Sequence, residues 1–409
     1  RRGRVVRRSP SVAHQSETPP NPRTRRRPPM APLVDDVTAE ILLRLPPDEP
    51  EHLFRAALVC KPWLRVLCDP GFRRRYRTFH GTPPLLGLLH RLQVIQGDPA
   101  PRLAPTTSAP LSPYPDCDRS RALDCGHGRV LLHVWVRGRG WHLTVWDPVT
   151  GDQQSLPEPG IPWLIYSAAV FCPVAGCDHL DCHGGPFRVV FVATDDYDEL
   201  VKAAVYSSET AAWSTPVTLD DGCESYVRHR RDVLAADGSF YYIPYVEPRR
   251  GAVIGDETYF TLREGNTIIR YDWAKNCISM VDPPDPNVYD DIALMVMEDS
   301  SLGFPCLENS SLYLFSRKVN AEWVCCRAIK LETVIPVADP DEEPVVVGCA
   351  EGVGVIFVST HVGLFTIKLN SGLVKKVAES GKYFSVLPYM SFYTPDHGRF
   401  SSLARLTDV

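Results

Sequence analysis

Residues 31–77 read APLVDDVTAEILLRLPPDEPEHLFRAALVCKPWLRVLCDPGFRRRYR, and this stretch decides how the chain is organised. Leu33, Val37 and Ile41 recur four residues apart, and further leucines beside them make the predicted first helix apolar over more than one face. A bundle this short buries too little surface to hide all of these side chains within itself. The surplus apolar surface therefore predicts an interface with another protein or domain.

Prolines and an acidic cap divide the stretch into three or four short helices. Pro46 ends the first helix, and Pro50 suits the first turn of the second. Pro62 cannot continue a helix without losing a backbone hydrogen bond, so we expect it to end the second helix and open a short turn. Asp69 and Pro70 then start the last helix as its cap and its first residue.

These residues resemble the F-box, the helical module that docks adaptor proteins onto a Skp-family linker of cullin-type ubiquitin ligases. The matching pattern is L-x-x-x-x-x-x-E-I-L-x-R-L-P from Leu33 to Pro46, followed by V-C-K-x-W up to Trp63. The family usually has proline directly after the first leucine, and Val34 in its place is expected to weaken docking slightly. The alternative is a helical hairpin that merely caps the following domain.

The resemblance also implies which side chains the linker contacts. They are the apolar residues of the matching pattern, namely Leu33, Ile41, Leu42, Leu45, Pro46, Leu58, Val59, Cys60 and Trp63.

Length and composition are those of an ordinary soluble protein with two or three domains. The chain has 409 residues, of which 44% are hydrophobic and 23% are charged. Because no run of about 18 apolar residues and no apolar leader is found, we expect no membrane association and a location in the cytoplasm and/or nucleus. Thirteen cysteines are an odd count for a disulfide framework, which favours reduced thiols.

Residues 1–29 differ from the rest in charge. They hold nine Arg and one Glu, which leaves a net charge of −13 for the remainder of a chain whose total is −5. With so little apolar content the segment is predicted to be disordered. It is interpreted as a basic nuclear-localisation or nucleic-acid tail or as an artefact of gene modelling, and Met30 immediately before the F-box-like run favours the second. The acidic remainder argues against nucleic acid as a partner.

From residue 84 to residue 396 the pattern changes to short strands divided by turns. A strand, a tight polar turn and a second strand recur in HLTVWDPVTGDQQSLP, AAVYSSETAAWSTPV, IIRYDWAKNCISMVDPP, RAIKLETVIPV and LFTIKLNSGLVKKV. The spacing of about 40 to 60 residues predicts a mainly β fold, a five- to six-bladed kelch-like β-propeller. A sixth unit is expected from residues 85–89 together with residues 383–393, which would close the ring, and residues 397–409 are expected to be a tail. The alternative is an open β-sandwich.

This region resembles the F-box-associated β domain of grass-type plant F-box proteins. The matching runs are CGHGRVLL at 125–132, VWDPVTG at 145–151, CDHLDCHGGPF at 177–187 and YMSFYTPD at 389–396. The two resemblances together imply a non-catalytic adaptor of a Skp–cullin–F-box E3 ubiquitin ligase. Residues 31–77 would bind the linker and through it a cullin, the β domain would bind an unknown target protein, and no cofactor is expected. The alternatives are a propeller-type enzyme and a zinc-containing nuclear regulator.

One cluster has the residue types of a metal site. FCPVAGCDHLDCHGG brings together Cys172, Cys177, His179, Cys182 and His183, and thiolate and imidazole are the ligands that zinc prefers. Zinc loops usually supply two ligand pairs from separate knuckles, whereas here one short insertion would supply all of them. The favoured interpretation is a loop whose cysteines pack as small apolar groups, and zinc is the less favoured alternative.

Overall fold

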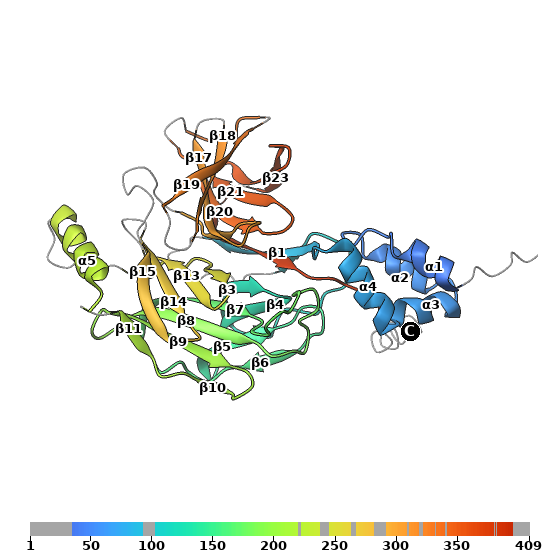
Figure 1. Cartoon of the computed structure of the whole chain (residues 1–409), viewed down its shortest axis with the longest axis horizontal. Helices are drawn as coiled ribbons and strands as arrows, with labels where there is room; N and C mark the ends of the chain where they lie inside the picture. Colours follow the sequence, from blue (N-terminus) through green and yellow to red (C-terminus); the bar gives the residue numbers. More distant parts are fainter. Residues whose placement is uncertain are drawn as a thin grey trace, which may run out of the picture.

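The computed structural model describes residues 35–92, 103–219, 222–237, 245–262, 267–281, 292–308, 311–318, 322–331, 333–339, 342–379, 381 and 383–395. Four helices come first, and strands make up most of the rest (Figure 1). Both predicted tails, together with Leu33 and Val34, lie outside the described residues. No helix in the described part is both long and apolar enough to cross a membrane.

The four N-terminal helices form a small bundle at one end of the molecule. Their bounds are α1 (Asp35–Leu42), α2 (Glu51–Ala57), α3 (Lys61–Cys68) and α4 (Pro70–His80). As predicted, Pro50 directly precedes α2, and Asp69 caps α4 by accepting a hydrogen bond from the Phe72 amide at 2.8 Å. The expectation for Pro62 is wrong. It lies in the first turn of α3, where its missing amide has no intrahelical partner to lose, and α2 ends earlier, at Ala57.

The strands form six antiparallel sheets, which are the blades of a propeller. Blade 1 contains β3 (Arg119–Gly126), β4 (Arg129–Val136), β5 (Gly140–Trp146) and β6 (Gln153–Ser155). Blade 2 contains β7 (Trp163–Phe171), β8 (Arg188–Asp195), β9 (Val201–Ser207), β10 (Ala212–Trp213) and β11 (Val217–Leu219). Helix α5 (Glu224–Asp237) follows blade 2.

The next three blades have four strands each. Blade 3 contains β12 (Ala252–Ile254), β13 (Glu257–Thr261), β14 (Ile268–Asp272) and β15 (Cys277–Val281). Blade 4 contains β16 (Met295–Val296), β17 (Leu302–Glu308), β18 (Ser311–Arg317) and β19 (Val324–Lys330). Blade 5 contains β20 (Val345–Ala350), β21 (Val355–Thr360), β22 (Gly363–Lys368) and β23 (Val374–Ala378).

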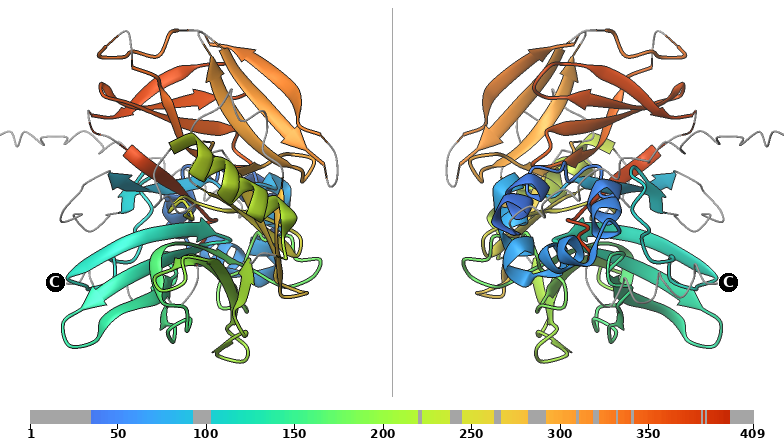
Figure 2. Two further views of the ribbon diagram at one scale, coloured as in Figure 1. Left: turned by 90° about the vertical axis from the view of Figure 1, so that its left-hand side faces the viewer. Right: turned by 90° about the vertical axis from the view of Figure 1, so that its right-hand side faces the viewer.

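Blade 6 joins the two ends of the propeller. It consists of β24 (Tyr383–Met390), β1 (Leu85–Leu92) and β2 (Leu103–Pro105). β24 and β1 are antiparallel, with Leu88 opposite Pro388 and His90 opposite Val386. β24 also contacts β3 of blade 1 and β20 of blade 5, so the ring is closed and the predicted sixth unit is confirmed. Figure 2 shows the molecule along its long axis, with the helical bundle in front of the blades in the right-hand view.

Neighbouring blades are held face to face by apolar side chains. In the described part of the chain every pair of adjacent blades encloses a buried apolar cluster of its own, including blades 6 and 1. The middle strands are therefore buried on both faces. In β8, Val189 and Phe191 pack toward blade 1, whereas Val190 and Val192 pack toward blade 3. The alternative expectation, an open sandwich, would leave the outer faces of its sheets without such clusters.

A charged network crosses the centre of the ring. Arg250 precedes β12 in blade 3, and its guanidinium lies 2.9 Å from Asp124 in blade 1 and 3.3 Å from Glu351 in blade 5. Asp124 also accepts the Val170 amide of blade 2 at 2.8 Å, and Glu351 accepts the Val296 amide of blade 4 at 3.0 Å. Burial alone would lower the pKa of Arg250, but the two carboxylates outweigh it and raise that pKa. One arginine and two carboxylates thus connect five blades.

Aspartate closes three of the tight turns. Asp147 follows β5, Asp195 ends β8 and Asp272 ends β14. The Oδ1 atom of each aspartate accepts hydrogen bonds from backbone amides of its own turn. In addition, Lys202 donates to Asp195 Oδ2, and Lys275 donates to Asp272 Oδ2. Burial opposes the charged form of all three. The hydrogen bonds to a basic partner and to the turn amides outweigh burial and hold the pKa of each below its ordinary value.

Replacing the central arginine tests the network. We expect Arg250→Met to lower the free energy of unfolding by about 3 kcal/mol, because it leaves the buried Asp124 carboxylate and the partly buried Glu351 carboxylate without their cation. Adding Asp124→Asn should recover part of this loss, since one unpaired charge is removed. Urea denaturation measures both variants, and exposed Arg139→Met is the matched control. A loss no larger than that of the control would contradict the role assigned to Arg250.

The turn aspartates predict acid sensitivity. Because the folded pKa of Asp195 is lowered, its charge contributes stability that is present above the ordinary aspartate pKa of about 3.9 and is lost as the pH falls through the folded value. We expect Asp195→Asn to be less stable at neutral pH and to lose less stability on acidification below about pH 4. Exposed Asp196→Asn, in the same turn, is the control. Identical urea midpoints of Asp195→Asn and the wild type across this pH range would refute the assignment.

Candidate functional site

The helical bundle exposes apolar side chains that its own core does not use. Val37 and Ile41, one turn apart on α1, are 47% and 49% exposed. Leu58 and Val59, between α2 and α3, are 74% and 62% exposed, and Cys60 beside them is exposed as well. Helices α1 and α3 lie at the end of the molecule farthest from the blades (Figure 1). These side chains are therefore open to contact with another protein.

The other residues that the F-box resemblance assigns to the linker lie deeper. Leu42 is 2% exposed and packs in the core of the bundle, where it supports the surface from inside. Leu45 and Trp63 are partly buried against that core, and Pro46 is half-buried. Val37 was not among the assigned residues, although it lies on the same stripe of α1 as Ile41.

The chain segment after β24 fixes the bundle to the propeller. Phe392 is 2% exposed and belongs to the core of the bundle, where its ring lies edge-on to that of Tyr76, with 6.2 Å between ring centroids. The next residue, Tyr393, stacks on Phe54 of α2 at 5.1 Å. Closure of the ring by β24 therefore places residues 391–395, which follow that strand, against the bundle.

The second connection is the loop between β7 and β8, residues 172–187, which we name the Cys/His loop. Leu180 packs against the core of the bundle, and the Asp181 carboxylate forms an ion pair with Arg77 of α4, whose side chain is 11% exposed. From the propeller side, the Arg129 guanidinium of β4 donates to two carbonyls of the loop. The loop is thus in contact with both the bundle and blade 1.

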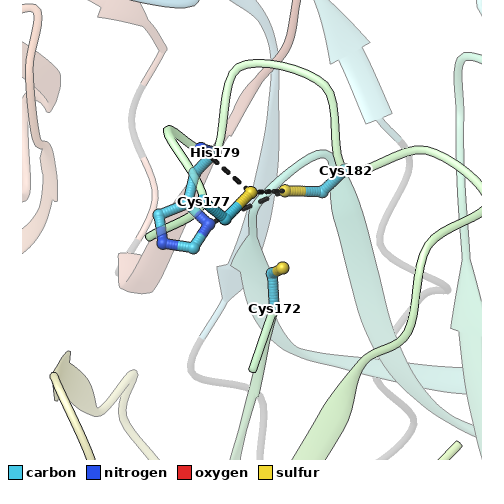
Figure 3. Close-up of side chains that lie close together, drawn as sticks. All are labelled: Cys172, Cys177, His179 and Cys182. Carbon is cyan, nitrogen blue, oxygen red and sulfur yellow. Dashed lines mark hydrogen bonds between the residues drawn. The ribbon is translucent and has the colours of Figure 1, made fainter. Parts of the chain in front are cut away.

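The Cys/His loop brings together four of the five residues that the sequence offers as candidate zinc ligands, the less favoured interpretation of this loop. The Sγ atoms of Cys172, Cys177 and Cys182 and a ring nitrogen of His179 all lie within 4.8 Å of one another (Figure 3). Cys177 Sγ is 3.8 Å from Cys182 Sγ, which is 3.7 Å from His179 Nδ1. Burial, followed by the two neighbouring thiols, raises the pKa of Cys182 well above its ordinary value. The geometry is that of a ligand cluster from one loop.

His183, the fifth residue of the predicted set, lies apart from these four. Its Nδ1 atom is 2.5 Å from Asp147 Oδ2, and its Nε2 atom is 2.9 Å from Ser391 Oγ. The imidazole therefore ties the Cys/His loop to a turn of blade 1 and to the segment that follows β24. A side chain at Gly128 would meet this ring, because a Cβ atom there would lie 3.0 Å from His183 Cε1.

His127 supports the cluster, and sequence reasoning assigned it no role. Its Nδ1 atom accepts the Cys172 amide at 2.9 Å, and its ring stacks on His179 at 3.9 Å with 7° between the planes. Burial, followed by the charges of His179 and Arg250, lowers the pKa of His127 to about 3, so this ring is neutral. In the sequence His127 belongs to a hairpin of blade 1, and no local pattern links it to the loop.

The propeller has openings at both ends of its innermost strands. A cavity of about 330 Å³ at the carboxyl ends of β3, β7 and β24 is lined by Arg250 and also by Gly81 and Pro83, so it faces the bundle. A cavity of about 590 Å³ lies at the amino ends of β7, β20 and β24. Apolar and charged side chains mix there, among them Leu164, Arg249 and Tyr383. This larger opening faces away from the bundle.

The joint between bundle and propeller is testable at Phe392. We expect Phe392→Ala to lower the free energy of unfolding by about 3 kcal/mol, because the ring is buried between the two parts. Urea denaturation measures the loss, and hydrogen exchange over α4 should become faster. Phe79→Ala is the matched control, since Phe79 is on the same bundle but 54% exposed. Unchanged exchange in α4 would show that Phe392 does not fix the bundle.

Comparison with known proteins agrees with the division of the chain into a helical bundle and a propeller. Residues 32–75 match the family model of the F-box domain. An F-box protein of Arabidopsis thaliana is 28% identical over 200 residues, and the match covers 44% of each chain, so this chain spans less than half the length of that relative.

Likenesses among solved structures are weak. The major allergen Mala s 1 of Malassezia sympodialis has 11% identity and a TM-score of 0.37, with 63% of this chain and 77% of that chain covered. A functionally unknown protein from Desulfotomaculum acetoxidans has 9% identity and a TM-score of 0.37, with 76% and 84% covered. By its sequence match and its topology, the chain consists of an N-terminal F-box domain followed by a mainly β, six-bladed propeller.

Proposed function

We propose that this chain is the target-recognition adaptor of a Skp–cullin–F-box E3 ubiquitin ligase. The F-box domain would bind a Skp-family linker and through it a cullin, and the propeller would bind a target protein. The match of residues 32–75 to the F-box and the relative named as an F-box protein support the proposal. The runs shared with grass-type F-box proteins support that finer assignment, and such an adaptor would work in the cytoplasm and/or nucleus.

The observation that carries the proposal is the exposed apolar surface of the bundle. Ile41, Leu58 and Val59 are each at least 49% exposed, although the bundle has a well-packed core of its own. Burying an exposed aliphatic side chain of this size contributes about 1.5 to 3 kcal/mol. Three such residues, with Val37 and Cys60 beside them, therefore form a surface whose burial by another protein would be favourable.

The larger opening of the propeller is our candidate for the target site. It lies at the amino ends of β7 and β24, whose carboxyl ends face the F-box domain, so a protein bound there would not compete with the linker. Two pairs of its ionisable groups contact each other: His361 Nδ1 lies 2.8 Å from Glu342 Oε1, and Arg249 Nε lies 3.9 Å from Glu247 Oε1. Tyr383 and other aromatic side chains share the rim. This mixture favours a bound protein segment over a propeller enzyme acting on a small molecule.

An adaptor of this kind makes no bond itself. It would hold a lysine of the target near the ubiquitin-charged enzyme and so raise the effective concentration of the two reactants. The rate of ubiquitin transfer would then depend on the relative position of the F-box domain and the larger opening. The Phe392 contact and the Cys/His loop determine that position, because they connect the bundle to the blades.

The exposed surface predicts a binding defect without a folding defect. The triple variant Ile41→Ser, Leu58→Ser and Val59→Ser should bind a purified Skp-family linker more than about tenfold more weakly, because three apolar contacts are lost. Isothermal titration calorimetry measures the affinity. Circular dichroism should show an unchanged melting temperature, since none of the three residues is buried.

A matched control tests whether polar substitutions elsewhere on the surface have the same effect on linker affinity. Val324, Val334 and Val377 are 59%, 68% and 41% exposed on the propeller, and serine at all three should leave linker affinity unchanged. If the triple variant in the F-box bound the linker with wild-type affinity, the assigned interface would be wrong.

A further inference from the structure

We propose that Cys172, Cys177, His179 and Cys182 bind one zinc ion, which holds the Cys/His loop in the shape that contacts the F-box domain. Zinc prefers four ligands of this kind in tetrahedral geometry, and a site closed by four protein ligands is structural rather than catalytic. This inference does not rest on the proposed ligase function.

The ligand distances are close to those of a zinc site. Ligand atoms 2.0 to 2.3 Å from a zinc ion lie about 3.5 to 3.8 Å apart at the corners of a tetrahedron. The distances of 3.8 Å between Cys177 and Cys182 and 3.7 Å between Cys182 and His179 Nδ1 agree with this spacing. No two ligand atoms of the set are more than 4.8 Å apart, about 1 Å beyond the tetrahedral spacing. A disulfide would need two sulfurs at about 2.05 Å, and the three cysteines of the set are free thiols.

Little burial supports the arm of the loop that carries Cys177, although a hydrogen bond of 3.2 Å from the Cys177 amide to the Val174 carbonyl closes its turn. Val174, Ala175 and Gly176 are exposed, so burial of this arm does not account for the return of Cys177 toward Cys182. The return requires left-handed backbone at Gly176, with φ of 71°, and at His179, with φ of 56°. A metal bound by residues on both sides of the turn would stabilise this conformation.

Neighbouring groups orient the ligands as the outer shell of a metal site does. The His127 ring stacks flat against His179, and its Nδ1 atom receives the amide of Cys172. The His179 amide donates a hydrogen bond to Cys177 Sγ at 3.4 Å, so backbone and ring contacts together orient three of the four ligands. When zinc binds, the three thiols release their protons to solvent as three Zn–S bonds and one Zn–N bond form.

The position of the site gives it a structural role. Leu180 and Asp181 lie between the ligands His179 and Cys182, and these two residues are the ones that contact the bundle. A zinc ion that fixes His179 and Cys182 therefore also fixes the Leu180 side chain against the bundle core and the ion pair of Asp181 with Arg77. Loss of the metal should loosen the bundle relative to the blades.

Metal analysis tests the site directly. The full chain, dialysed first against zinc sulfate and then against metal-free buffer, should retain about one equivalent of zinc by inductively coupled plasma mass spectrometry. Cys182→Ser and His179→Ala should each retain less than about a third of an equivalent. His179→Cys keeps four ligands and should restore binding, which separates ligand loss from misfolding. Cys349→Ser, at a buried thiol of blade 5, should bind zinc like the wild type.

Two results would overturn the proposal. One is a wild-type chain that holds less than about a third of an equivalent of zinc, or that holds iron instead. The other is zinc retained equally by Cys182→Ser and His179→Ala. Hydrogen exchange tests the contact between the Cys/His loop and the bundle. In the wild type, a chelator should speed amide exchange in residues 172–187 and in α4. In His179→Ala, which should already lack zinc, the chelator should not change the exchange rates. Linker affinity is measured separately, so failure here leaves the ligase assignment standing.

Discussion

The pairing of β24 with β1 is the constraint on which the rest of the structure depends. β1 follows the helical bundle directly, and β24 is the last strand, so their ladder closes the ring and brings the C-terminal segment back to the helices. Each blade then has a neighbour on both sides, and the middle strands are buried on both faces. Arg250 at the centre finds carboxylates from two other blades only because the ring is closed.

Closure also makes the F-box domain and the propeller one connected unit. Phe392 enters the core of the bundle because β24 ends beside it, and the Cys/His loop reaches the bundle from blade 2. The exposed apolar surface at Ile41 and Leu58 lies at one end of this unit, and the larger propeller opening faces away from it. An adaptor needs such an arrangement, since it must hold a target at a constant distance from the enzyme that modifies it.

Local signals in the sequence predicted the elements well, and contacts between distant segments much less well. Proline and cap positions such as Asp69 predicted the helices, but Pro62 was misplaced because proline suits both the end of one helix and the start of the next. In blade 4 the recurring unit falls on β19, one strand later than in the other blades, which explains its irregular spacing. The predicted ligand set included Cys172 and Cys182, whereas His127 comes from another blade and Leu42 proved to be buried.

We propose that the bundle joins this propeller to a cullin ligase through a Skp-family linker. Size-exclusion chromatography with light scattering tests this most directly, with the purified full chain mixed at micromolar concentrations with the linker and a cullin. We expect an equimolar complex of chain and linker that also recruits the cullin. A chain that elutes alone at its own mass, while linker and cullin elute together, would refute the proposed ligase role.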